Sequence, residues 1–258
     1  MNDFLDALAA DAVATVDSGY YEHPARVKHV VVSLRTSIQQ SIKVPVIAEV
    51  KGASPSKGTI RRDFSPEKIS QAMARGGAVG ISVLTEPKHF SGSIENFARV
   101  RESVNLPLLM KDIMVSPRQL DAAEKVGANV VLFIQAIFDR GYCPLGLGEM
   151  IAKAHSKNLE VLLETHTVDE FTSATATKAD LVGINNRNLG TLQTDLNTTK
   201  SILSKRKGGK VVVSESGINT PADIQFLRGC GAEAFLIGSA IMSADDVEAK
   251  VREFVNAQ

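Results

Sequence analysis

Three stretches of the sequence share one pattern, a glycine followed at once by a short apolar run, and this near-repeat limits the folds open to the chain. The stretches cover residues 77–84, 127–134 and 231–238. In each, an amphipathic stretch ends at the glycine, which commonly terminates a helix. A continuous apolar run is typical of a parallel strand buried on both faces. The near-repeat therefore predicts helices that alternate with buried parallel strands.

Apolar runs of this kind recur along most of the chain. They lie near 45–50, 79–84, 107–110, 129–134, 160–164, 180–184, 210–215 and 233–237. Between them, Ser65, Ser116 and Thr220 each precede a proline, which is the signal of a capped helix start. Evenly spaced β/α units over about 250 residues favour a closed barrel over an open sheet. We predict an α/β fold, a (β/α)₈ TIM barrel over residues 45–258.

Residues 1–44 precede the first predicted strand. Two helices are predicted there, at about 2–15 and 24–41, separated by Gly19, Tyr20 and Tyr21. We interpret them as an N-terminal helical extension that caps the barrel within one domain overall. Whether this extension contributes to an active site is left open by the sequence.

Composition and charge exclude several classes of function. The 258 residues include 29 basic and 29 acidic side chains, so the basic excess of a nucleic-acid binder is absent. Cys143 and Cys230 have no metal-like spacing and no evident reason to pair, as in a reducing cytosol. The first residues lack a signal peptide, and no apolar run approaches the ~20 residues that span a membrane. We expect a cytoplasmic protein without nucleic-acid or membrane partners, either a monomer or a weak homo-oligomer.

Charged or amide side chains follow most of the predicted strands. In a barrel the carboxyl ends of the strands face the active site, and a buried charge is costly unless it is paired. These positions therefore indicate function more than stability. The side chains at the predicted strand ends are Glu49 and Lys51; Lys111; Glu164; Asn185, Asn186 and Arg187; and Glu215.

The lysines and glutamates have both functional and structural interpretations. Glu49 and Lys51 lie two apart and so point to one face of a strand, as catalytic groups or as a buried ion pair. A desolvated Lys111 beside other cations would lose proton affinity and act as a general acid, or it would extend to solvent at the rim. Glu164 is predicted to be a base with a raised pKa, a partner for a lysine, or both.

Glycine–serine pairs end the last two strands. Ser216 with Gly217, and Gly238 with Ser239, occupy the positions where barrels commonly bind phosphate, although these glycines could simply form turns. Residues 238–242 leave room for a short helix. None of the histidines has zinc-ligand spacing, and His166 is interpreted as a loop residue. We predict a phosphorylated small-molecule substrate, no metal and no organic cofactor.

From about residue 30 to its end, the chain resembles indole-3-glycerol-phosphate synthases. The resemblance rests on the following runs, in this order: Ile47-Ala48-Glu49-Val50-Lys51 with Ala53-Ser54-Pro55-Ser56-Lys57-Gly58; Leu84-Thr85-Glu86-Pro87-Lys88 with Phe90; Lys111-Asp112; Gly183-Ile184-Asn185-Asn186-Arg187; Ser214-Glu215-Ser216-Gly217-Ile218; and Phe235-Leu236-Ile237-Gly238.

The resemblance implies a reaction and a role for each matching residue. The substrate would be 1-(2-carboxyphenylamino)-1-deoxyribulose 5-phosphate, which undergoes ring closure, decarboxylation and dehydration in tryptophan biosynthesis, the work of a carboxy-lyase. Lys111 would be the general acid, Glu164 the general base, and Lys51 the contact to the substrate carboxylate and a proton donor. The other implied residues are Glu49 and Asn185 as organisers of the site, and Ser54, Phe90, Arg187, Ser216, Gly217, Gly238 and Ser239 as substrate or phosphate contacts.

The sequence departs from the family pattern at three positions, none of which is a proposed catalytic group. Gly52 stands where a basic residue is common, Ile113 where phenylalanine is common and Asn188 where aspartate is frequent.

Two other functions are considered as alternatives to a synthase. One is a sugar-phosphate isomerase barrel, which usually works with two acids or with an acid and a cysteine. The other is a barrel that binds a ligand without catalysis.

Overall fold

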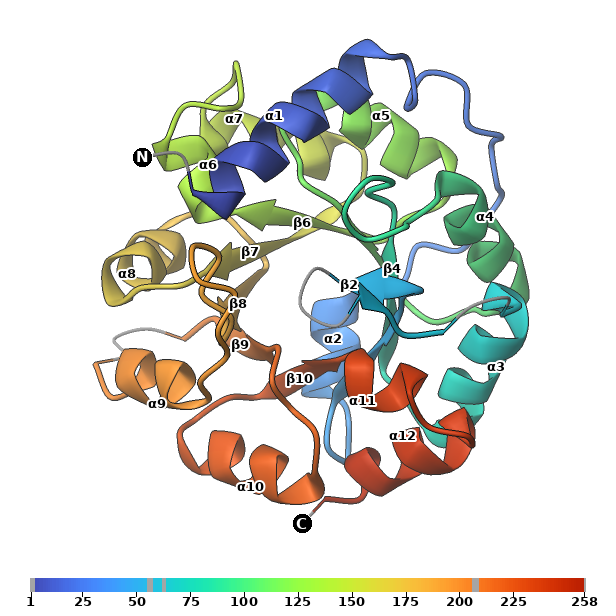
Figure 1. The fold of residues 1–258 in the computed structure, drawn as a ribbon, viewed down its shortest axis with the longest axis vertical. Coiled ribbons are helices and arrows are strands. Elements are labelled where there is room, and N and C mark those ends of the chain that lie inside the picture. The colour runs from blue at the N-terminus through green and yellow to red at the C-terminus, as the bar shows by residue number, and fades with distance from the viewer. Residues whose placement is uncertain (1–2, 55–57, 62–63, 206–208, 258) are drawn as a thin grey trace.

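A closed ring of parallel strands forms the centre of the protein in the computed structural model, which describes residues 3–54, 58–61, 64–205 and 209–257. Within these residues the barrel order is β1-β10-β9-β8-β7-β6-β5-β4, and every neighbouring pair is parallel (Figure 1). The predicted (β/α)₈ TIM barrel of the α/β class is confirmed. The barrel strands are β1 (Val46–Val50), β4 (Gly80–Leu84), β5 (Leu108–Lys111), β6 (Val130–Ile134), β7 (Glu160–Thr165), β8 (Leu181–Asn185), β9 (Val211–Glu215) and β10 (Ala234–Ile237).

The helices after the first strand surround this ring, and the signals read from the sequence set their ends. Ser65, Ser116 and Thr220 each accept a backbone hydrogen bond at the start of α3, α5 and α10, as predicted. Gly77 ends α3 in the left-handed conformation, with φ of 99°. These helices are α3 (Pro66–Gly76), α4 (Ile94–Ser103), α5 (Pro117–Lys125), α6 (Gln135–Asp139), α7 (Leu147–Ser156), α8 (Val168–Ala176), α9 (Asn197–Leu203), α10 (Pro221–Gly229), α11 (Ser239–Met242) and α12 (Val247–Val255).

The strands are buried on both faces. Every residue of β1, β4, β6, β8, β9 and β10 is buried, because the barrel interior covers one face and the outer helices cover the other. This double burial explains why the strands read as unbroken apolar runs rather than as alternating ones. The polar residues at their carboxyl ends are therefore exceptions to this apolar pattern.

The N-terminal extension is less helical than predicted. Helix α1 (Phe4–Asp17) corresponds to the first predicted helix, but α2 (Leu34–Gln39) is only the last part of the helix predicted at 24–41. The prediction was wrong for residues 24–33. Pro24 and the β-branched run of residues 30–32 disfavour a helix there, and the backbone bonds elsewhere, with the Val27 amide donating to the Lys125 carbonyl.

The two helices of the extension lie at opposite ends of the barrel. Helix α2 covers the amino ends of the strands and is seen through the ring in Figure 1. There the Leu34 amide donates to Glu160, the first residue of β7, and the Leu34 side chain packs against Gly80, the first residue of β4. Helix α1 crosses the end where the strands finish. The extension thus reaches both ends of the barrel.

A small antiparallel hairpin that the sequence did not predict follows β1. It pairs β2 (Ala53–Ser54) with β3 (Gly58–Thr59). Residues 55–57 of the family motif lie outside the described residues.

In the described part of the chain, none of the helices has the length and apolar character needed to cross a membrane.

Candidate active site

A cavity of about 390 Å³ opens at the carboxyl ends of the barrel strands. Ser54 is the one predicted site residue that does not line it: its backbone lies in β2, and its side chain falls outside the described part of the structure. The predicted site residues that line the cavity are Glu49, Lys51, Phe90, Lys111, Glu164, Asn185, Arg187, Ser216, Gly217, Gly238 and Ser239.

Barrel closure brings these residues together. Lys111, Asn185 and Glu215 are the last residues of β5, β8 and β9, and Glu164 is the last but one of β7. Asn185 is in register with Glu215 across the β8–β9 pair. Parallel strands in a closed ring all end on the same rim, so residues more than one hundred positions apart meet there.

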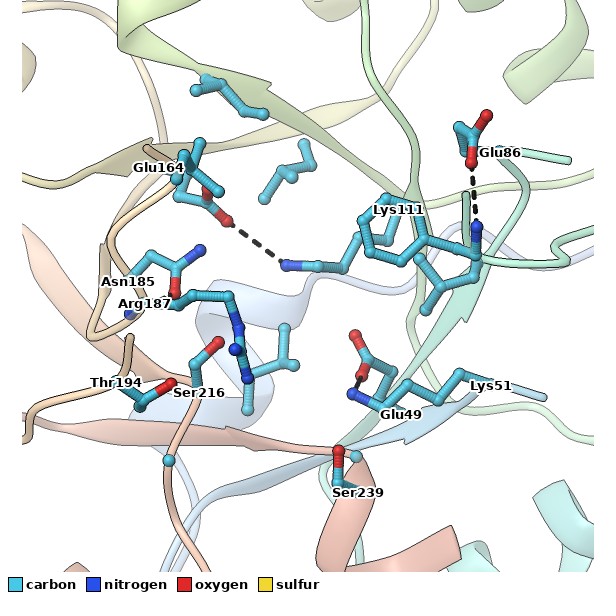
Figure 2. Close-up of a pocket in the computed structure, with 18 of the residues that line it drawn as sticks. Glu49, Lys51, Glu86, Lys111, Glu164, Asn185, Arg187, Thr194, Ser216 and Ser239 are labelled. Carbon is cyan, nitrogen blue, oxygen red and sulfur yellow. Dashed lines mark hydrogen bonds and ion pairs between the residues drawn. The ribbon is translucent and has the colours of Figure 1, made fainter. Parts of the chain in front are cut away.

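The Lys111 ammonium lies between two carboxylates. Its Nζ is 2.7 Å from Glu215 Oε2 and 3.3 Å from Glu164 Oε2, and Figure 2 shows it extending across the cavity toward Glu164. Burial alone would lower the pKa of Lys111, but the charges of Glu215, Glu164 and Glu49 outweigh it and raise that pKa. The expectation of a lysine weakened by neighbouring cations was therefore wrong, because its neighbours are anions. The neighbouring carboxylates therefore keep the Lys111 ammonium protonated.

Glu164 is held in the ionised form. Burial alone would raise the pKa of Glu164, as the sequence suggested, but the charges of Lys111 and His166 and a hydrogen bond from Asn185 lower it. The expectation of a raised pKa was wrong, because the carboxylate has two cations beside it. An ionised carboxylate at the centre of the cavity can accept a proton from a ligand.

Glu215 is a site residue to which the sequence analysis assigned no role. Burial and the nearby charge of Glu164 raise the pKa of Glu215 to about 7, although Lys111 opposes this effect. Its Oε1 makes no hydrogen bond to any described residue. The available signal was its position, since it ends a buried strand just as Asn185 does.

Glu49 and Lys51 form a second ion pair in the cavity. Lys51 Nζ lies 2.5 Å from Glu49 Oε2, and both side chains are largely buried. The two side chains point to the same face, as their spacing predicted (Figure 2). The ion-pair interpretation and the functional interpretation hold together here, because this pair lines the cavity.

The end of the cavity near β9 and β10 provides polar groups suited to an anion. Ser216 and Gly217 both have left-handed backbones, with φ of 67° and 82°, which turn the chain directly after β9. Gly238 and Ser239 follow β10, where the predicted short helix α11 begins. Arg187 and Ser216 both line the cavity (Figure 2). Burial lowers the pKa of Arg187, whose Nη1 donates to the Leu192 carbonyl.

The opposite part of the cavity is apolar. Phe90 and Ile113 line it together with Leu132 and Ile134. Phe4 and Leu8 of α1 also line it, so the N-terminal extension does contribute to the cavity. The sequence contained no signal for that contribution, because an apolar residue on an amphipathic helix is usually a core residue.

Glu86 holds the turn that carries Phe90. Its buried carboxylate accepts backbone hydrogen bonds from Lys88, His89 and Phe90, at 2.9, 2.7 and 3.0 Å. Three donors on one carboxylate fix the turn and so set where the Phe90 ring lies. Glu86 belongs to the family run of residues 84–88, but the sequence did not show that its carboxylate holds this turn.

His166 lies in the loop after β7, as expected, beside Glu164 rather than in the cavity lining. Among the residues that the structure describes, no cluster of three or more histidine, cysteine, aspartate or glutamate side chains could hold a metal ion. The groups that the site offers a ligand are therefore ammonium, guanidinium, carboxylate, amide and hydroxyl.

Comparisons with known proteins agree on one family. Residues 8–254 match the family model described as indole-3-glycerol phosphate synthase. The synthase of that name from Bordetella pertussis is 39% identical over 256 residues, which are 95% of this chain and 96% of the relative. The one from Dehalococcoides mccartyi is 42% identical over 216 residues, 83% of this chain and 82% of the relative.

Solved structures resemble the fold more distantly. A thiamine phosphate pyrophosphorylase from Pyrococcus furiosus superposes with a TM-score of 0.59 at 20% identity, covering 87% of this chain and 97% of that chain. At such low identity the likeness concerns the barrel alone.

Proposed function

Because the chain belongs to the indole-3-glycerol phosphate synthase family, we propose that its cavity converts 1-(2-carboxyphenylamino)-1-deoxyribulose 5-phosphate into indole-3-glycerol phosphate, carbon dioxide and water. The observation that carries this proposal is the pairing of two largely buried lysines with glutamates in one cavity, which also carries hydroxyl groups and a guanidinium suited to an anion. The proposed enzyme is a carboxy-lyase of tryptophan biosynthesis.

Lys111 acts in ring closure. The ring carbon that bears the carboxylate attacks the substrate ketone, a carbon–carbon bond forms and negative charge develops on the ketone oxygen. An ammonium aimed at that oxygen stabilises the transition state and then donates its proton. The raised pKa of Lys111 suits this role, because the proton moves only when an alkoxide, a stronger base, forms beside it.

Lys51 acts on the carboxylate end of the substrate. It binds the carboxylate before the carbon–carbon bond to carbon dioxide breaks and the ring regains its aromatic electrons. It then protonates the hydroxyl group that leaves as water. Glu49, 2.5 Å away, holds Lys51 in place for both steps. The apolar wall around Phe90 and Ile113 packs against the aromatic ring.

Glu164 takes the proton that leaves the substrate as the indole double bond forms. Its ionised state in the free protein makes it ready for this step. Asn185 orients it through a hydrogen bond. Glu215, with a pKa of about 7 beside Lys111, is suited to return a proton to that lysine after turnover.

The phosphate binds at the ends of β9 and β10. Ser216, Ser239 and the amides near Gly217 and Gly238 provide hydrogen-bond donors, and Arg187 provides positive charge and orients its neighbours. Ser54 is assigned to the substrate by family resemblance alone. A phosphate bound far from the reacting carbons helps to hold them in attacking geometry.

We further propose a cytoplasmic location, supported by the free thiols of Cys143 and Cys230. The balanced charge supports a protein without a nucleic-acid partner. No step above requires a metal or an organic cofactor, because side chains supply and accept each proton. The protein acts as a monomer or a weak homo-oligomer, which light scattering after size-exclusion chromatography would distinguish.

Turnover of the carboxyphenylamino substrate, followed by indole fluorescence, tests the function. We expect Lys111→Ala to lower kcat by roughly 10²–10⁴-fold, the usual contribution of a general acid. Substrate binding, measured by titration calorimetry, should change much less. Lys250→Ala, at a partly exposed lysine of α12 that pairs with Glu253 outside the cavity, is the matched control and should behave like the wild type.

Two results would contradict this proposal. No fluorescence from folded wild-type protein at any pH would disprove the activity. Near-normal turnover by Lys111→Ala would disprove the role given to that lysine while leaving the activity in place.

A further inference from the structure

The carboxylate of Glu164 has a basic side chain on each side. Its Oε2 faces Lys111 Nζ at 3.3 Å, and its Oε1 faces His166 Nε2 at 3.4 Å. His166 does not line the cavity, and its side chain is only 14% exposed. The imidazole therefore contacts the proposed base from behind, on the side away from the substrate.

Glu170 holds the imidazole from its other side. Its Oε2 lies 3.5 Å from His166 Nδ1 and accepts a 2.7 Å hydrogen bond from the His166 backbone amide. Glu170 lies in the first turn of α8, where its own amide donates to the Thr167 hydroxyl at the helix cap. The capped start of α8 thus fixes Glu170, which in turn fixes the ring.

The charges around His166 favour its protonated form. Burial alone would lower the pKa of His166, but the hydrogen bond to Glu170 and the charges of Glu164, Glu170 and Glu215 outweigh it, and that pKa is raised. These groups come from α8, β7 and β9, while Lys111 of β5 faces the same Glu164 carboxylate. Nε2 forms no hydrogen bond to any described residue, so its interaction with Glu164 is mainly one of charge.

The catalytic cycle creates a need for this second cation. On the function proposed above, Lys111 gives its proton to the substrate oxygen and becomes neutral. From that moment Lys111 no longer stabilises a negative charge on Glu164, although Glu164 must still be a carboxylate for the later proton removal. A desolvated carboxylate without a cation beside it would tend to become protonated.

We propose that His166 is a positioning residue for Glu164: the imidazolium, held by Glu170, orients that carboxylate and keeps it ionised after Lys111 has lost its proton. This inference rests on the base role proposed for Glu164 and adds to it a pair, His166 and Glu170, that does not touch the substrate.

The pH dependence of kcat tests the proposal. His166→Gln removes the positive charge, so Glu164 is protonated more easily, and the acid limb of the kcat profile should move up by about one to two pH units. At neutral pH, above the shifted limb, kcat should fall by less than about twofold, while KM stays nearly constant. Glu170→Gln should shift the limb in the same direction by less. His155→Gln is the matched control, because His155 pairs with Asp180 at the surface and should leave the profile unchanged.

A direct titration of the wild type completes the experiment. Nitrogen NMR of the imidazole should find His166 titrating above 6.5, the ordinary value for histidine. A variant profile lowered by the same factor at every pH, or a wild-type His166 that titrates below 6.5, would overturn the inference. Failure of the proposed function is a separate outcome, because there the wild type itself would not turn over the substrate, while the NMR titration could still be measured.

Discussion

Two glycines control how closely the charged side chains of the cavity pack. A Cβ atom on Gly238 would lie 2.1 Å from Glu49 Oε2 and 2.7 Å from Lys51 Nζ. One on Gly183 would lie 2.3 Å from Glu215 Oε1. Neither glycine has a positive φ, so the space taken by the neighbouring ion pairs, and not backbone strain, excludes a side chain.

Gly238→Ala should therefore displace the Glu49–Lys51 pair without unfolding the barrel. We expect kcat to fall roughly tenfold to a hundredfold, since displacements near 1 Å can cost that much. Steady-state kinetics and a thermal melt would measure the two effects. Gly148→Ala is the control, because nothing lies within 4 Å of a Cβ there. Equal kcat values for both variants would mean that the position of this pair does not limit turnover.

At the scale of single elements, α1 is attached to the barrel by ion pairs at its start and near its middle. Arg140, just after α6, binds Asp3 at 2.8 Å and Asp6 at 2.5 Å. Farther along the helix, Asp11 pairs with Lys88 and His89, at 2.9 and 2.8 Å. Because Phe4 and Leu8 of the same helix line the cavity, these pairs connect the helix position to the apolar part of the site.

Arg140→Ala should loosen α1 and weaken substrate binding. Exposed ion pairs of this kind contribute little to the free energy of unfolding, because solvent screens them, so the fold should survive. We expect KM to rise several-fold while kcat changes little, and the amides of α1 should exchange faster with deuterium. An unchanged KM together with faster exchange would show that α1 does not contribute to binding.

A low pH should loosen α1 in the same way as the Arg140→Ala substitution. The hydrogen bond to Arg140 lowers the pKa of Asp3 to about 2, and ion-pair partners also lower the pKa of Asp11. The ionised Asp3 carboxylate stabilises the attachment of α1 fully above the ordinary aspartate pKa of 3.8, and this contribution is lost as pH falls toward 2. Exchange of α1 amides, corrected for its intrinsic pH dependence, should accelerate over that range in the wild type and less in Arg140→Ala.

At the scale of the whole molecule, the two ends of the barrel have different tasks. The carboxyl ends of the strands carry the charged cavity, whereas the amino ends are covered by the apolar face of α2. The extension reaches both ends, so we propose that residues 1–44 and the barrel of 45–258 unfold as one cooperative unit. A single transition, observed by tyrosine fluorescence and by circular dichroism, is the expected result.

Substitutions at the two ends of the extension should separate stability from binding. Leu34→Ala should cost about 2–5 kcal/mol, because Leu34 is buried beneath the barrel, and each kcal/mol lowers Tm by roughly 2–4 °C. Its KM should stay near the wild-type value. Phe4→Ala should raise KM with a much smaller loss of Tm. If both variants lowered Tm equally and left KM unchanged, this division of tasks would be wrong.

Much of the fold could be predicted from local sequence. A few adjacent residues determine where each strand lies and where each helix begins or ends. Examples are the helix starts at Ser65, Ser116 and Thr220, and the left-handed end of α3 at Gly77. The helix predicted at 24–41 was wrong over residues 24–33 for the complementary reason. There the backbone finds its partner in Lys125, about one hundred residues away, which no local pattern reports.

The residue types of the cavity were also evident in the sequence, because charges at the ends of buried strands are rare unless they have a function. The pKa shifts of these side chains were not evident in the sequence. The sequence placed Lys111 among cations and expected a raised pKa for Glu164, whereas barrel closure surrounds Lys111 with carboxylates and places His166 beside Glu164. A pKa depends on charges within a few ångströms, and those charges come from different strands.

The sequence by itself therefore determined the eight-strand pattern and which chemical groups stand at the strand ends. Tertiary structure alone decided which of those groups pair: Lys111 with Glu215 and Glu164, and Glu164 with His166. It also decided that α1 would complete the cavity. The physical reason is that secondary structure follows from neighbours along the chain, while charge pairing follows from distance in space, which is set only when the barrel closes.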